Sequence, residues 1–277
     1  MDSLSAIHQR FSVRSYTDDP VDPMLLGRLL HFAEGAMTLA AAPPRIALIS
    51  GQEHVRQVLT FMIGSYGLVQ NAPHLLAAII PEDAESARVQ LGYVLEQVVL
   101  EATRLGLGTC WITGSYDAKQ TEDILGLEGD EVAAAVCALG HPTEEGFGRL
   151  HTKLIRRLAG GHKRKPLTKI VFSQHWGEPW LPEAADAALL TVLNHARLAP
   201  SAHNGQPWRF VVHPAGILLS VVSPRFIDAG IVMSHFTLAA AAANYEGAWT
   251  LCLRDGETAA AHQLPARAIP IGIFRTE

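Results

Sequence analysis

Apolar positions recur along the chain with two different periods, and these periods predict its helices and strands. Helical spacing predicts helices over 3–10, 23–36, 84–105, 117–125, 183–198 and 230–245. Short apolar runs between turn residues predict strands over 45–50, 73–80, 132–139, 208–212 and 217–222. Ser3 or Ser5 is expected to cap the first helix. The 84–105 stretch is apolar almost all round, so we expect this helix in the core.

Composition narrows the class of protein without deciding its function. The 277 residues allow one large domain or two small ones, and the net charge of −5 favours no nucleic-acid partner. Cys110, Cys137 and Cys252 stand in apolar runs without metal-ligand spacing, which predicts buried thiols and no metal site. The N-terminus lacks the apolar core of a signal peptide, and no apolar run approaches membrane-spanning length. We therefore expect a cytoplasmic protein without a membrane partner.

A polar loop before one predicted strand is the most informative stretch. It reads Leu-Ala-Pro-Ser-Ala-His-Asn-Gly-Gln-Pro-Trp over residues 198–208. Two prolines restrict its backbone, and Ser201, Asn204 and Gln206 both donate and accept hydrogen bonds. Such a loop suits a flat ring rich in heteroatoms. The alternative is an ordinary turn before a strand.

The segment after the first predicted helix carries a candidate anion site. In an extended chain Arg10, Ser12 and Arg14 fall on one side, and guanidinium groups match phosphate oxygens. A solvated strand edge is the alternative. No Ser-His-Asp or Cys-His arrangement is evident, and no HExxH, CxxC, P-loop or GxGxxG motif is present.

The polar loop resembles the A-P-S-x-x-N-x-Q-P-W-x-F signature of FMN-dependent nitroreductases. In that family the motif lines the flavin from one side of a dimer interface. The resemblance implies that FMN contacts come from a set of loop residues, namely Pro200, Ser201, Ala202, Asn204 and Gln206.

Three further segments resemble parts of the same family. Arg10, Ser12 and Arg14 match its R-x-S-x-R segment, which implies a grip on the FMN phosphate and ribityl chain. Residues 108–114 resemble a glycine-containing segment whose backbone approaches flavin N5 and O4, which implies roles for Trp111, Ile112, Thr113 and Gly114. A basic run resembles the terminal phosphate-binding segment, with Arg164 as the first candidate and Lys163 and Lys165 together behind it. A solvated linker is the alternative origin of such a run.

The family motif usually lies near the N-terminus, and an internal repeat explains its displacement here. Pro44 aligns with Pro207 at an offset of 163, and Gly92 aligns with Gly230 at an offset of 138. Residues 1–172 form the first predicted repeat, and residues 173–277 form a shortened second one. In the first repeat Thr38 stands opposite Ser201, but Ala41 and Pro43 stand opposite Asn204 and Gln206, so its polar groups are lost.

The chain thus resembles the duplicated "putative TM nitroreductase" group, in which one chain supplies both halves of the usual dimer. The resemblance implies an α+β nitroreductase-like fold, with helices packed on antiparallel-type sheets and the two repeats forming a pseudo-dimer. It also implies an FMN-dependent oxidoreductase that transfers hydride from NAD(P)H, through flavin N5, to a nitroaromatic, a quinone or a similar small acceptor. No side chain needs a direct catalytic role. A flavin-binding or flavin-processing protein without this turnover, or a remnant that has lost FMN, are the alternatives. We expect a monomer, with a homodimer as the alternative.

Overall fold

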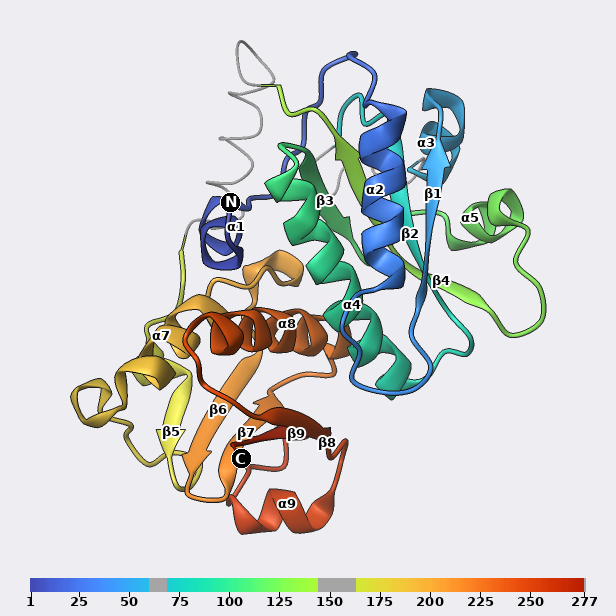
Figure 1. Cartoon of the computed structure of the whole chain (residues 1–277). Helices are drawn as coiled ribbons and strands as arrows, with labels where there is room; N and C mark the ends of the chain where they lie inside the picture. Colours follow the sequence, from blue (N-terminus) through green and yellow to red (C-terminus); the bar gives the residue numbers. More distant parts are fainter. Residues whose placement is uncertain (60–68, 144–162, 277) are drawn as a thin grey trace.

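The computed structural model describes residues 1–59, 69–143 and 163–276, and within them the strands form two sheets (Figure 1). The first sheet has the order β1-β2-β4-β3 and is antiparallel throughout. Its strands are β1 (Arg45–Ser50), β2 (His74–Ile80), β3 (Gly108–Ile112) and β4 (Val132–Gly140). The second sheet has the order β5-β6-β7-β9-β8 and is antiparallel except where β5 runs parallel to β6. Its strands are β5 (Val171–Ser173), β6 (Trp208–His213), β7 (Gly216–Val221), β8 (Ala248–Leu251) and β9 (Ile269–Arg275).

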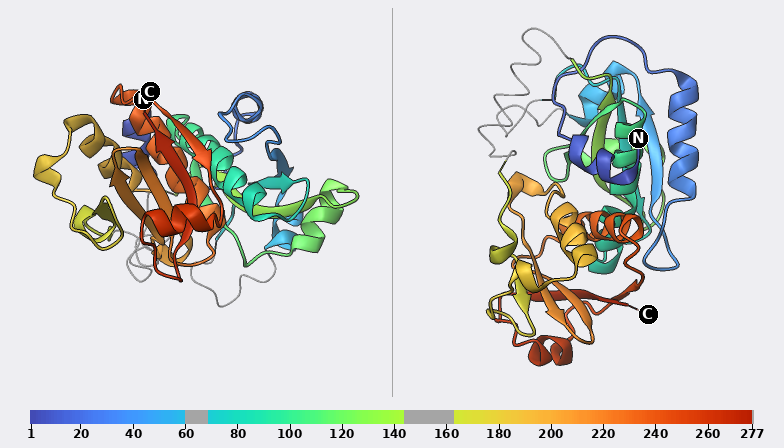
Figure 2. Two further views of the ribbon diagram at one scale, coloured as in Figure 1. Left: turned by 90° about the horizontal axis from the view of Figure 1, so that it is seen from below. Right: turned by 60° about the vertical axis from the view of Figure 1, so that its left-hand side comes forward.

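Helices lie between the two sheets and on their outer faces (Figure 2). In chain order these are α1 (Ser3–Gln9), α2 (Pro23–Glu34), α3 (Gln52–Val58), α4 (Glu85–Arg104), α5 (Ala118–Leu125), α7 (Ala187–Ala196), α8 (Phe226–Ala242) and α9 (Gly256–Ala261). Helix α4 packs on the first sheet, α8 packs on the second, and the two helices pack against each other. One hydrophobic core therefore runs from sheet to sheet through this helix pair. The predicted α+β architecture with helices on antiparallel sheets is confirmed.

The start of α1 and the end of α4 follow capping rules, and the starts of α1 and α8 each correct the prediction. The α1 cap is Asp2, whose Oδ1 accepts from Ser5 N at 2.7 Å, and neither predicted serine fills that position. Helix α4 ends before Gly106, whose φ of 78° suits a C-terminal glycine, as predicted. Helix α8 begins at Phe226, four residues before the predicted start, because the apolar pattern continues through its first turn.

Two glycines allow α4 and α8 to cross at very short range. A Cβ added to Gly92 would overlap the carbonyl of Ile227, with the carbonyl carbon 2.9 Å away. A Cβ added to Gly230 would overlap the carbonyl of Val89, again with the carbon at 2.9 Å. The two contacts are reciprocal, because Val89 and Ile227 are separated by the same 138 positions as the two glycines. This crossing fixes how the two halves of the core meet.

The two sheets share one strand order once β5 is set aside. Strands β1-β2-β4-β3 of the first sheet correspond in sequence order to β6-β7-β9-β8 of the second. Each sheet has one long helix between its second and third strands in sequence, α4 in one case and α8 in the other. The predicted repeat boundary after residue 172 falls inside β5, which belongs to the second sheet.

The cysteines lie as free thiols. Cys110 and Cys137 are buried, as predicted, and burial raises the pKa of both thiols. Cys252 is only half-buried, which corrects the prediction for that residue, and burial raises the pKa of its thiol to about 11.

Candidate functional site

The polar loop between α7 and β6 holds an unusual backbone conformation. His203, Asn204 and Gln206 all have positive φ values, of 52°, 53° and 48°. Asparagine tolerates this region, but glutamine adopts it only where the surroundings impose it. Gln206 N donates to Ser201 Oγ at 2.9 Å, which closes the loop on itself. The conformation is therefore built into the loop and is a feature typical of functional sites.

The side-chain amides of Asn204 and Gln206 form hydrogen bonds with the basic segment, residues 163–165, which precedes β5. Lys165 N donates to Gln206 Oε1 at 2.8 Å, and Gln206 Nε2 donates to Lys163 O at 3.3 Å. Arg164 Nη1 donates to Asn204 Oδ1 at 3.0 Å, and Asn204 Nδ2 donates to Lys163 O at 3.0 Å. Two predicted groups of site residues, about 40 positions apart in sequence, are thus joined. Gln206 is buried, and its side-chain amide binds the backbone of Lys163 and Lys165. It therefore positions the basic segment.

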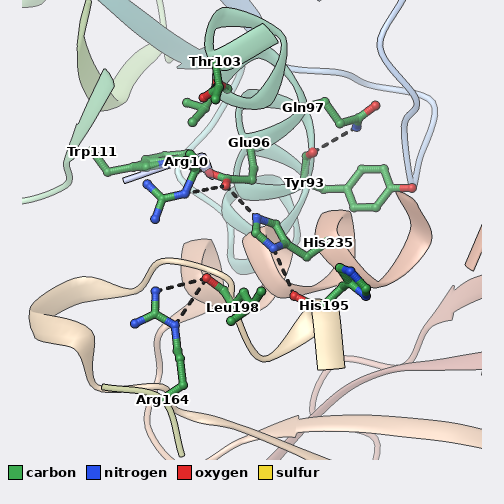
Figure 3. A network of polar contacts seen from close by, with 11 residues as sticks. Arg10, Tyr93, Glu96, Gln97, Thr103, Trp111, Arg164, His195, Leu198 and His235 are labelled. Carbon is green, nitrogen blue, oxygen red and sulfur yellow. Dashed lines mark hydrogen bonds and ion pairs between the residues drawn. The ribbon is translucent and has the colours of Figure 1, made fainter. Parts of the chain in front are cut away.

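Arg164 and Lys165 both donate hydrogen bonds to backbone carbonyls of the polar loop. Arg164 donates through Nη2 to Leu198 O at 3.1 Å (Figure 3). Lys165 Nζ donates to Gly205 O at 2.7 Å and to Gln206 O at 3.0 Å. Burial, and then the nearby Arg209 charge, lower the pKa of Lys165. Both cations thus lie at the loop, with Arg164 next to Asn204.

The segment after α1 lies along the first sheet. Ser12 forms a parallel bridge with Thr109, and Val13 N donates to Thr109 O at 2.8 Å. A Cβ at Gly108 would lie 2.8 Å from the Val13 side chain, so glycine at this position allows the segment to dock. Residues 10–14 and the start of β3 therefore form one unit, which brings together two of the predicted site segments.

Two arginines of this segment carry a buried Nε atom that has no hydrogen-bond acceptor in the described residues. Arg10 Nε and Arg14 Nε are both buried without a hydrogen-bond partner. Arg14 Nη1 reaches only Ser12 O, at 3.4 Å, and Arg10 Nε lies 3.7 Å from a carboxylate oxygen of Glu96. A buried N–H donor without an acceptor is costly, so these two Nε atoms suit an anionic ligand group such as a phosphate.

Residues at the end of β3 complete the first half of the predicted site. Trp111 Nε1 donates to Glu96 Oε2 at 2.7 Å, and Ile112 is buried. Thr113 is half-buried, and no atom lies within 4 Å of the position of a Cβ at Gly114. Glu96 was not predicted as a site residue, although a carboxylate within an otherwise apolar helix is a signal that could have found it.

The two halves of the predicted site meet where α1 packs beside the end of α7. Ala6 and Ile7 of α1 form an apolar cluster with Leu100, and Leu198 packs against it. Arg10 follows α1 directly, and Arg164 binds the carbonyl of Leu198. Figure 3 shows Arg10 and Arg164 on the two sides of this junction. Helix α1, which leads into the arginine segment (residues 10–14), thus packs against Leu198, where the polar loop begins.

Asp228 anchors the polar loop to α8. Ala202 N donates to Asp228 Oδ1 at 3.1 Å, and the carboxylate is buried in the first turn of the helix. Burial raises the pKa of Asp228 to about 6, and the hydrogen bond from Ala202 and the charge of Arg225 oppose this rise. The first half has a matching contact, because Leu39 N donates to Gln90 Oε1 at 2.7 Å.

The raised pKa of Asp228 makes stability depend on pH with a definite sign. The folded state binds this proton more tightly than the unfolded state, so the stabilisation is complete below pH 3.8 and is lost as pH rises through 6. The shift corresponds to about 3 kcal/mol. Between pH 4 and pH 8, we expect the free energy of unfolding of the wild type to fall by about this amount relative to Asp228→Asn. Urea titrations of both proteins across this range measure it, and parallel pH profiles would contradict it.

Other features of the described chain lie outside this arrangement. Residues 1–59, 69–143 and 163–276 contain no group of three or more His, Cys, Asp or Glu side chains placed to hold a metal ion. Over the same ranges, every helix is too short or too polar to cross a membrane. A surface cavity of about 510 Å³ lies beside α1, and its lining contains none of the predicted site residues.

Comparison with known proteins agrees with the fold and the motifs. The family described as "Putative TM nitroreductase" matches residues 2–240. The chain belongs to this nitroreductase family. A crystal structure of a "putative nitroreductase" from Thermotoga maritima superposes with a TM-score of 0.62 at 20% identity, covering 99% of this chain and 94% of that one. An NADH dehydrogenase from Thermus thermophilus is 28% identical over 189 residues, covering 53% of this chain and 90% of the relative. Membership of the nitroreductase family indicates an oxidoreductase.

Proposed function

We propose that the protein is an FMN-dependent oxidoreductase that takes electrons from NAD(P)H and passes them to a small acceptor such as a nitroaromatic or a quinone. Membership of the nitroreductase family supports this function. The observation that carries the cofactor assignment is the pair of buried nitrogens, Arg10 Nε and Arg14 Nε, which have no hydrogen-bond partner within the described residues. When bound, FMN would supply the hydride chemistry at its N5 atom.

The residues fall into three groups of proposed roles. Arg10 and Arg14 would hold the phosphate and the adjoining chain, with Ser12 offering a hydroxyl beside them. Arg164, held by Asn204, would add a further cation, and Trp111 to Gly114 would approach the ring. Ser201 and Gln206 fix the loop conformation, which sets where Pro200, Ala202 and Asn204 lie. Because the flavin carries the chemistry, these side chains bind, orient and exclude water.

We also propose that the chain is an internal duplication that forms a pseudo-dimer. Reciprocal contacts support it, since Gly92 meets Ile227 as Gly230 meets Val89. Anchoring of the loops gives separate support. Leu39 and Ala202 differ by the predicted offset of 163, and their partners Gln90 and Asp228 differ by the predicted 138. Divergent repeats would preserve such pairs because each pair fixes the same loop in its own repeat.

The duplication leads to one proposed site for each chain. The arginine segment belongs to the first repeat and the polar loop belongs to the second, and these two approach each other around Leu198. The loop of the first repeat carries Thr38, Ala41 and Pro43 at the positions of Ser201, Asn204 and Gln206, so it lacks the side-chain amides. A monomeric state and a cytoplasmic location stay predictions.

Replacing Asn204 with alanine tests the proposed site against the loop of the first repeat. The change removes the hydrogen bonds that the Asn204 side chain makes to Arg164 Nη1 and to Lys163 O, so we expect FMN to bind about tenfold more weakly, a loss of about 1.4 kcal/mol. Flavin fluorescence titration measures the affinity, and oxidation of NADH and NADPH with a quinone acceptor measures turnover. Thr38→Ala, at the exposed position of the first-repeat loop that corresponds to Ser201, is the control and should leave both unchanged. A loss of flavin on Thr38→Ala with none on Asn204→Ala would show that the site lies in the other loop.

A further inference from the structure

Glu96 is a fully buried carboxylate at the centre of the helix pair. Polar side chains from three parts of the chain lie around its two oxygens. His235 Nε2 on α8 lies 2.8 Å from Oε1, and Trp111 Nε1 on β3 lies 2.7 Å from Oε2. Arg10 Nε, just after α1, lies 3.7 Å from Oε1. Figure 3 shows these side chains converging on the carboxylate. Glu96 therefore links the first half of the proposed site to α8 of the second half.

The donor and acceptor roles in this cluster follow from the chemistry of each group. A carboxylate only accepts hydrogen bonds, so Trp111 Nε1 and His235 Nε2 are the donors. The guanidinium of Arg10 is a cation 3.7 Å from this carboxylate, and the other ring nitrogen of His235, Nδ1, lies 3.4 Å from the carbonyl oxygen of His195. Side chains of Glu96 and His235 are both 0% exposed, and that of Arg10 is 5% exposed. An ion cluster buried to this degree costs desolvation, so packing alone gives no reason for a carboxylate here.

The matching position in the second repeat carries no carboxylate. At the offset of 138, Glu96 corresponds to Ser234, whose buried Oγ has no hydrogen-bond partner within the described residues. Trp249 corresponds to Trp111, and its Nε1 donates to Thr237 Oγ1 at 3.1 Å instead. The two helices of the crossing thus differ at this position: α4 carries the carboxylate of Glu96, and α8 carries the hydroxyl of Ser234. The charge stands on the side that carries Arg10, Arg14 and the proposed flavin site.

We propose that Glu96 is a positioning residue that orients Trp111 and Arg10 from behind the site and lowers the reduction potential of the bound flavin through its negative charge. This inference rests on the proposed function. Reduction adds negative charge to the flavin, so a nearby carboxylate opposes it and the Arg10 cation favours it. Removal of the carboxylate leaves the positive charge of Arg10 unbalanced beside the site and makes reduction easier.

The reduction potential of bound FMN tests the inference. Loss of a negative charge near the flavin shifts the potential in a definite direction, whereas a merely structural role predicts no direction. Wild type, Glu96→Gln and Glu96→Asp are loaded with FMN and reduced against a reference dye. We expect Glu96→Gln to favour reduction about tenfold, a shift of about 30 mV to more positive potential. Glu96→Asp keeps the charge but moves it away from Trp111, so its potential should stay near the wild-type value while FMN binds about tenfold more weakly. Should Glu96→Gln fail to fold, unchanged FMN affinity in Glu96→Asp would still overturn the proposal.

Glu101→Gln is the matched control. Glu101 is a buried carboxylate on the same helix, but its partners are Arg28 at 3.7 Å and Arg104 at 3.5 Å. Loss of this charge should leave the potential of FMN unchanged. Equal potentials in wild type and Glu96→Gln, or equal shifts in Glu96→Gln and Glu101→Gln, would overturn the role of Glu96 while leaving the proposed function intact. A wild type that takes up no FMN would overturn the proposed function and this inference together.

Discussion

Gly230→Ala is expected to destabilise the protein by about 3 kcal/mol, because a Cβ at this position overlaps backbone of the opposite helix. The new methyl group would meet the carbonyl of Val89 and lie 2.6 Å from Tyr93 N. Neither atom is the end of a flexible side chain, so α4 and α8 would have to move apart along the whole core. Gly92→Ala should have a similar effect through the carbonyl of Ile227. Urea unfolding of both variants, followed by circular dichroism, measures the loss.

Gly27→Ala provides the control for this pair. Gly27 lies within α2, and no atom lies within 4 Å of the position of its Cβ. Alanine is a better helix former than glycine by about 0.5–1 kcal/mol, so this variant should be slightly more stable than the wild type. If Gly230→Ala and Gly92→Ala were as stable as Gly27→Ala, the close helix crossing would be wrong.

Arg14→Ala should weaken FMN binding by about 1.5–3 kcal/mol, or roughly ten- to hundredfold, because it removes a charge-assisted contact to the phosphate end of the ligand. Within the described residues, the side chain makes one long hydrogen bond, to Ser12 O at 3.4 Å. The fold should therefore lose little when Arg14 is shortened, and the effect should fall on affinity. Calorimetric titration with FMN, together with a thermal melt of the unliganded protein, separates the two quantities.

Arg45→Ala is the matched control for Arg14→Ala. Arg45 lies on the edge strand β1 and forms an exposed ion pair with Glu131 at 3.1 Å. Its removal should change neither FMN affinity nor, beyond about 1 kcal/mol, stability. A large drop in the melting temperature of Arg14→Ala with unchanged FMN affinity would mean that the arginine serves the fold instead of the ligand.

Local pattern was enough to predict most of the elements that position the site. Strand β1 is confirmed at both ends, and α4 agrees within one residue at each end, because strong apolar periodicity and clear turn residues bound both segments. The predicted offset of 138 pairs Gly92 with Gly230, and the two glycines take equivalent places in the helix crossing. The predicted start of α8, at residue 230, was wrong because Asp228 interrupts the apolar residues of the first turn. An acidic residue at such a place is typical of a loop that precedes a helix. That acidic residue is present because it anchors Ala202, a tertiary contact that local pattern does not contain.

The sequence motifs predicted which residues belong to the candidate site. They did not predict which of these residues bind one another. Asn204 and Gln206 were expected to face a ligand, whereas their amides bind residues 163–165, and no sequence spacing encodes a pairing across 40 positions. Glu96 and His235 were missed because motif comparison highlights loops, while these two side chains lie inside buried helices. Their polarity in an apolar setting was the available signal, since buried ionisable groups need a partner.

The number of FMN molecules that one chain binds tests the central claim most directly. The protein is purified, saturated with FMN and desalted, and flavin absorbance is compared with protein concentration from amino-acid analysis. One composite site, with the arginine segment from the first half and the polar loop from the second, predicts one FMN per chain. Two FMN per chain would contradict the claim that the first-repeat loop, which lacks the polar side chains, cannot bind the cofactor. If no FMN were retained, the assignment of the cofactor would be wrong.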